Sequence, residues 1–136
     1  MNTRRFVGAA AAVFVVRAIL NTGFYGFAMK GQFDAMMAAS PGVFRQVPVA
    51  YIVLDLLTAI LFTYLFVKAG AAFGGGVKGG VVLGLLFAIL CPIIGSLYWF
   101  FSVTVYPTNM VVEESVYQLV AHAIQGAVAG AIYKTA

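Results

Sequence analysis

The chain has 136 residues, of which 63% are hydrophobic and only 9% are charged, and its mean hydropathy is +1.02. A soluble domain carries about 25% charged residues, so this composition cannot cover a globular core with a water-facing surface. The net charge is +4, but the basic residues form no run or stripe of the kind that a nucleic-acid backbone requires. The composition therefore predicts an integral membrane protein that has no nucleic-acid partner.

Four stretches of the chain are long and apolar enough to cross a hydrocarbon core as helices, which takes about 20 residues each. They cover residues 6–29, 47–67, 80–106 and 111–133. The predicted fold is therefore all-α, with residues 1–136 forming a single integral membrane domain built as a four-transmembrane-helix bundle. Arg17 interrupts the Ala-rich run that follows Arg4 and Arg5, so we expect the first stretch to stay as a helix instead of being removed as a signal peptide.

The connection between the first two stretches, about residues 30–46, is the longest in the chain. Its Phe33, Met36 and Met37 can line one side of a short interfacial helix, which Ser40-Pro41-Gly42 would end.

The third stretch is longer than a bilayer requires, and Pro92 is the expected position of a bend within it. The glycines at 74–76, just before this stretch, indicate a turn. A phosphate-binding loop is excluded there, because Lys78 is followed by glycine and not by serine or threonine.

Basic residues in short connections favour the cytoplasmic side of a membrane protein. With four spans, one side of the membrane receives Arg4, Arg5, Lys68, Lys78 and Lys134. The opposite side receives only Lys30 and Arg45. This difference predicts that both termini lie in the cytoplasm.

Helices in lipid gain little from hydrophobicity against one another, so close packing depends on small side chains. Such residues recur at four-residue spacing in the third and fourth stretches, at Gly80, Gly84, Ala88, Gly126 and Gly130. Bulky aromatic residues gather towards the other membrane face, among them Phe24, Tyr25, Phe44, Tyr98 and Trp99. We expect a bundle that is narrow at the cytoplasmic end and wider, or filled by aromatic rings, at the outer end.

Three ionisable residues from three stretches fall at the same depth. Arg17 lies roughly 16 Å from the inner start of its helix, given a rise of about 1.5 Å per residue. Asp55 lies about 12 Å from the outer start of the second stretch, and His122 is also near the centre of the fourth. An unpaired charge at this depth costs on the order of 3 kcal/mol, so Arg17 and Asp55 should pair with each other.

Further polar residues are expected at the same depth as Arg17, Asp55 and His122, because helical spacing places them on the same helix faces. Asn21 shares a helix face with Arg17, and Thr58 shares one with Asp55. On the fourth stretch, a polar stripe comprises Glu114, Gln118, His122 and Gln125. Lipid cannot satisfy such a stripe, so it should face the protein interior. Glu113 and Glu114 would stand at the outer mouth of any path that leads to the centre.

Three interpretations of this midplane polar cluster are open. In the first, an Arg17–Asp55 ion pair with hydrogen-bonding neighbours fixes the register of the helices. In the second, the cluster is a proton or ion path or a solute site, with His122 titrating and Asp55 as the relay. In the third, His122 is the axial ligand of haem or a chlorophyll-type pigment. Haem in helix bundles usually needs two ligands, which one histidine supplies only across a dimer.

Enzyme chemistry is not indicated by the sequence. Cys91 has no partner for a disulfide or a zinc site, and the lone histidine cannot complete a metal centre. Glu113 and Glu114 are adjacent and point apart on a helix, so they form no acid–base pair. We therefore expect neither a resident metal nor an enzymatic activity.

The Gly23-Phe24-Tyr25-Gly26 step near the end of the first stretch, followed by a Met- and Phe-containing loop, resembles short, uncharacterised four-span bacterial membrane proteins. The Gly79, Gly80 and Gly84 pattern that opens the third stretch is similar to theirs as well. The resemblance covers most of the chain in layout, and it implies a four-span architecture in a bacterial inner membrane. Arg17 within the first span departs from that pattern.

The first functional hypothesis is a structural or accessory subunit that acts by helix–helix contact, in a homo-oligomer or a larger membrane complex. The alternative is an oligomeric transporter or channel for protons or a small solute, although residues 1–68 and 69–136 show no internal repeat. Haem or pigment binding through His122 is the second alternative.

Overall fold

The computed structural model describes residues 1–43, 47–102 and 105–134, and throughout this part the chain is helical, without strands. The long helices are α1 (Thr3–Gly23), α3 (Pro48–Ala69), α4 (Gly76–Ala88) and α6 (Thr108–Tyr133), and the shorter ones are α2 (Lys30–Ala39) and α5 (Ile94–Ser102). Short turns extend them: α1 continues as a π-helix over Phe24–Ala28, α3 as a 3-10 helix over Gly70–Phe73, and a π-helix over Ile89–Ile93 joins α4 to α5. The all-α prediction is confirmed. Phe44 and Arg45, used in the predictions above, lie outside the described residues.

The helix ends differ from the predicted ones for local reasons. α1 begins at Thr3 because the Asn2 side chain accepts a hydrogen bond from the Arg5 N–H and caps the helix. α4 begins at Gly76, earlier than the predicted residue 80. Gly74, Gly75 and Gly76 have φ angles of 97°, 64° and 49°, a left-handed conformation that suits glycine, so the turn is complete sooner than expected. The predicted short helix is present as α2, which ends at Ala39 with Ser40 as its C-cap, and its place at a membrane interface stays a prediction.

Three helical segments are long and apolar enough to cross a membrane: Thr3–Ala28, Pro48–Phe73 and Gly76–Ser102. The helix α6 has 26 residues but is not among them. It carries Gln118, His122 and Gln125 in its central part, and these polar side chains lower its hydropathy.

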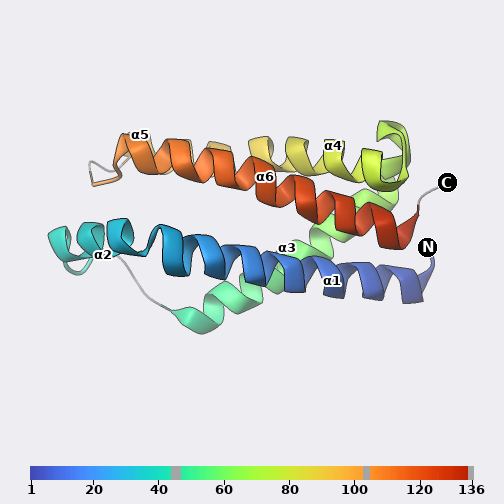
Figure 1. Cartoon of the computed structure of the whole chain (residues 1–136), viewed down its shortest axis with the longest axis horizontal. Coiled ribbons are helices and arrows are strands. Elements are labelled where there is room, and N and C mark those ends of the chain that lie inside the picture. The colour runs from blue at the N-terminus through green and yellow to red at the C-terminus, as the bar shows by residue number, and fades with distance from the viewer. Residues whose placement is uncertain (44–46, 103–104, 135–136) are drawn as a thin grey trace.

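Helices α1, α6 and the α4–α5 segment run side by side, while α3 crosses behind them on a diagonal (Figure 1). Both termini lie at one end of the bundle, together with the turn between α3 and α4. The helix α2, the end of α5 and the start of α6 lie at the other end, which we call the α2 end. The helix α6 contacts α1, α3, α4 and α5, so the helix with Gln118, His122 and Gln125 along its middle is also the central one.

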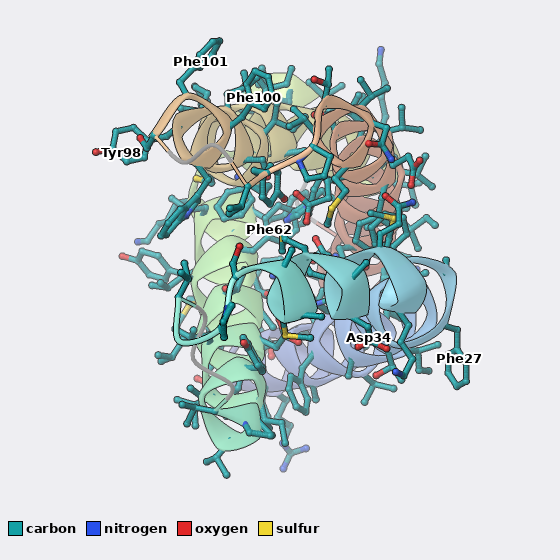
Figure 2. All side chains as sticks on the ribbon, turned by 90° about the vertical axis from the view of Figure 1, so that its left-hand side faces the viewer. Phe27, Asp34, Phe62, Tyr98, Phe100 and Phe101 are labelled. Atoms are coloured by element: carbon teal, nitrogen blue, oxygen red, sulfur yellow. The ribbon has the colours of Figure 1, made fainter. Side chains whose placement is uncertain are left out.

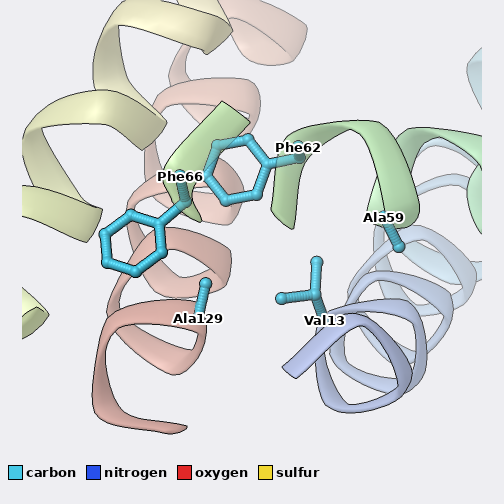
Figure 3. Packing of buried hydrophobic residues seen from close by; sticks show 5 residues of the cluster. All are labelled: Val13, Ala59, Phe62, Phe66 and Ala129. Carbon is cyan, nitrogen blue, oxygen red and sulfur yellow. The ribbon is translucent and has the colours of Figure 1, made fainter. Parts of the chain in front are cut away.

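The core has an apolar centre on the side of the termini. Val13, Ala59, Phe62, Phe66 and Ala129 are fully buried there, and they join α1, α3 and α6 (Figure 3). A second apolar cluster, Met29, Met36 and Met110, packs α2 against the start of α6.

Helices α4 and α6 are antiparallel and touch through their backbones. A Cβ atom on Gly80 would lie 1.9 Å from the Gly126 carbonyl oxygen, and one on Gly84 would lie 2.1 Å from that of His122. A Cβ atom on Gly130 would likewise lie 2.1 Å from the Gly76 carbonyl oxygen. The small residues singled out in the sequence therefore form one continuous contact, with Ala88 buried next along α4. This contact runs along the whole of α4, which begins at the α3–α4 turn, at the end of the bundle that holds the termini.

The expected aromatic filling of the α2 end is only partly present. Tyr117 and Phe24 stack inside the bundle, with ring centroids 3.9 Å apart. Figure 2 shows Phe27, Tyr98 and Phe101 at the periphery, where their side chains point away from the helices. These outward rings suit an interfacial belt, and only the smaller inner group packs between helices.

The first half of α3 stands apart from the bundle. Its apolar side chains are exposed on all sides: Ile52, Val53, Leu54, Leu56 and Leu57. Asp55 is the exception, since only 18% of its side chain is exposed. The diagonal course of α3 separates its start from α5 (Figure 1).

Candidate functional site

An ion pair between α1 and α3 is the centre of the site. Arg17 Nε donates to Asp55 Oδ1 over 2.6 Å, and the side chains are 16% and 18% exposed. One helical turn beyond Arg17, the Asn21 amide donates to both Asp55 oxygens, each at 3.0 Å. The structure therefore places Arg17, Asn21 and Asp55 together, as the sequence spacing predicts.

The hydrogen bonds of His122 fix its tautomer. Arg17 Nη1 lies 3.3 Å from His122 Nε2, and His122 Nδ1 lies 2.9 Å from the Gln118 carbonyl oxygen. A guanidinium only donates and a carbonyl only accepts, so Nδ1 carries the proton and Nε2 accepts. His122 is thus a neutral acceptor, and α6 joins the pair through it. The ring is 1% exposed, so a haem iron could reach Nε2 only if Arg17 moved away.

Two tyrosines extend the network towards the α2 end. The Tyr117 hydroxyl donates to Asn21 Oδ1 over 2.5 Å, and Gln118 Nε2 donates to the Tyr25 hydroxyl over 3.0 Å. Tyr25 was predicted only as one of the aromatic residues near the outer membrane face, and neither tyrosine was predicted to hydrogen-bond to the cluster. The signal was present in the spacing, because Tyr25 lies four residues after Asn21 and Tyr117 three after Glu114, each on the polar face.

Glu113 and Glu114 occupy different environments, although both were predicted at an outer mouth. Glu114 is only 5% exposed, and it accepts hydrogen bonds from Ser96 Oγ at 3.1 Å and from the Tyr106 hydroxyl. Burial raises the pKa of Tyr106, and its hydrogen bond to Glu114 raises the pKa further. The Tyr106 hydroxyl therefore stays protonated and is the donor of this hydrogen bond. Glu113 is exposed, and it accepts from Gln32 Nε2 over 2.9 Å.

Two of the predicted residues do not join the cluster. Thr58 is half-buried one turn from Asp55, but it makes no hydrogen bond to the rest of the site within the described chain. Gln125 is 1% exposed, and neither its amide oxygen nor its nitrogen has a partner among the described residues. The predicted polar stripe of α6 is nevertheless inside, since Glu114, Gln118 and His122 are also buried.

The assembled site is a neutral network that links three helices. It contains one cation, one carboxylate and a neutral imidazole, held by direct contacts among their own groups. Among residues 1–43, 47–102 and 105–134, no three His, Cys, Asp or Glu side chains are grouped as metal ligands would be. Comparisons with family models, with curated proteins and with solved structures find no match to this chain.

Changing Tyr117 to phenylalanine should destabilise the bundle by about 1 kcal/mol, because the Asn21 amide oxygen then loses its donor. Reversible unfolding by a denaturing detergent in mixed micelles would measure this loss. The change of Tyr98 to phenylalanine is a matched control, because that side chain is 72% exposed. A loss no greater for Tyr117→Phe than for Tyr98→Phe would contradict a structural role of the hydroxyl.

Proposed function

We propose that the chain crosses the membrane four times, with α6 as the fourth span. Support comes from the two faces of α6. The polar side chains in its central part, Gln118, His122 and Gln125, are buried in the bundle. The side chains on its outer face are apolar and exposed: Val112, Val116, Val120 and Ile124. A helix with this pattern presents hydrocarbon to lipid and keeps its polar groups for the interior, which makes it compatible with a bilayer despite its lower hydropathy.

We place both termini on the cytoplasmic side of a bacterial inner membrane. Arg4, Arg5, Lys68, Lys78 and Lys134 belong to segments at the same end of the bundle, in agreement with the positive-inside rule. A fluorescent protein fused after Lys134 should therefore fold and fluoresce in the cytoplasm, and a periplasmic phosphatase inserted at Gly42 should be active. The reverse pattern of activities would contradict this orientation.

The function that the geometry supports best is that of a structural or accessory subunit, which acts through contacts between its helices and other helices in the membrane. The observation that carries this proposal is the network of Arg17, Asn21, Asp55, Tyr117 and His122. Its groups hydrogen-bond mainly to one another across α1, α3 and α6, an arrangement that fixes helix rotation and register. The exposed apolar side chains of α3 and of the outer face of α6 are surfaces that a partner helix could contact.

Size measurement of the assembly tests this proposal. Extracted in a mild detergent, the protein should be part of a particle heavier than its own 14.4 kDa, as measured by native mass spectrometry. Asp55→Asn should weaken that assembly and leave the proton conductance of the membrane unchanged. Asp34→Asn, which changes an exposed aspartate outside the network, is the control. A stable monomer whose Asp55→Asn variant loses a proton-dependent flux would overturn the proposal.

A further inference from the structure

The surroundings of the Arg17–Asp55 pair differ between the two directions along the bundle. Towards the termini, the apolar cluster of Val13, Phe62 and Ala129 follows, and α4 touches α6 backbone to backbone. Towards the α2 end, hydrogen-bonding groups continue almost without interruption along α6. They pass from Tyr117 and Gln118 to Glu114 and finally to Glu113 at the surface. On the α2 side of the pair, polar side chains thus reach the surface, whereas on the side of the termini Thr63 and Gln125 are buried without a partner among the described residues.

One side chain of the polar centre has hydrogen-bonding capacity that the described residues do not use. Arg17 donates through Nε and Nη1, its Nη2 donates to no described residue, and 16% of its side chain is exposed. Acyl chains offer no acceptor to such a group. The Arg17 guanidinium therefore calls for a polar molecule at mid-depth.

From these observations we infer that the bundle holds a water-accessible half-channel, which opens at the α2 end and stops at Arg17, Asp55 and His122. Water that enters near the exposed Glu113 would pass the buried Glu114, follow the polar face of α6 and supply an acceptor for Arg17. The glycine contact and the apolar cluster close the other end. This inference goes beyond the structural role proposed above, since a bundle held by an ion pair could equally be dry.

The charges along the half-channel indicate which solutes it admits. Glu113 and Glu114 lie at its outer part, and neither is in an ion pair in the described structure, where the pairs are Arg17–Asp55 and Lys30–Asp34. The negative potential of two carboxylates attracts cations and repels anions. The half-channel should therefore admit water and small cations, protons included, and exclude anions.

Single-cysteine labelling tests the half-channel in intact membranes. In a Cys91→Ala background, Ser96→Cys and Gln118→Cys would each be treated with a membrane-impermeant, cationic methanethiosulfonate from either side. A thiol reacts as its thiolate, which forms in water and not in lipid, so both variants should be modified at least about tenfold faster than a lipid-facing control. Val120→Cys is that control, because it lies two residues from Gln118 with its side chain 55% exposed on the outer face.

Further comparisons make each outcome decisive. Both reactive cysteines should be modified only from the side that holds the α2 end, and an anionic reagent of the same size should react more slowly. Ala129→Cys in the apolar cluster should stay unreactive from both sides. The inference fails if Ser96→Cys and Gln118→Cys react no faster than Val120→Cys while the variants assemble normally. Ser96→Cys changes a single atom of the side chain, so it keeps the test valid if Gln118→Cys does not fold. Loss of assembly in the Asp55→Asn variant bears on the structural role alone.

Discussion

Replacing Arg17 by alanine should destabilise the protein by about 3–5 kcal/mol, because Asp55 is then a carboxylate at mid-depth without its cation. His122 would also lose the donor to its Nε2 atom. The free energy of unfolding, measured by denaturing-detergent titration in mixed micelles, would quantify the effect. We expect it to be among the largest of any single substitution in the chain.

The double variant Arg17→Leu with Asp55→Leu distinguishes loss of the pair from loss of packing. Replacing both charged partners by apolar residues of similar volume is often neutral for stability, so the double variant should regain most of what Arg17→Ala loses. An Arg17→Ala variant as stable as the native chain would show that the pair does not hold α1 to α3. Restored stability with lost assembly would indicate that the network also sets the surface that a partner recognises.

The second large effect is expected at the contact between α4 and α6. Gly126→Leu would place a Cβ atom 1.9 Å from the Gly80 carbonyl oxygen, where no real Cβ atom can stand. The obstacle is backbone, which cannot rotate away as a side chain does, so the two helices must separate along their length. Overpacking of a well-packed site costs about 1–3 kcal/mol and occasionally more, and we expect this variant at the upper end of that range.

Gly95→Leu is the matched control for this prediction. Gly95 is also a helical glycine, in α5, but a Cβ atom there meets nothing within 4 Å. The same detergent titration should therefore show Gly95→Leu to be as stable as the native chain or more so, because leucine favours the helix over glycine. If the two leucine variants unfolded at the same detergent fraction, close contact at Gly126 would not contribute to stability.

The sequence alone predicted much of this site because a charge in an apolar helix has few acceptable positions. Arg17 and Asp55 can be reconciled with lipid only by facing each other, and helix spacing then brings Asn21 to the same place. The glycine contact was predictable for a similar reason, since four-residue spacing of small residues on two helices indicates the faces that can approach closely.

Other features depended on geometry that the sequence does not contain. The spacing placed Glu113 and Glu114 together at a mouth, but the position of α5 decides that Ser96 and Tyr106 enclose only Glu114. The diagonal course of α3 follows from packing against several helices at once, so no local pattern encodes it. Gln125 lies on the predicted stripe, yet whether a partner reaches it depends on side chains from the other helices.

The central place of α6 has a consequence for how the protein is made. Of the described helices α6 leaves the ribosome last, and its glutamines and histidine make it a poor candidate to enter a bilayer alone. The three apolar helical segments precede α6 in the chain, so the polar side chains that it contacts, such as Arg17 and Asn21, are already in place when α6 is synthesised. Biogenesis should therefore depend on the order of the segments, and a chain that ended before Thr108 would expose Arg17 and Asp55 to the quality-control proteases of the membrane.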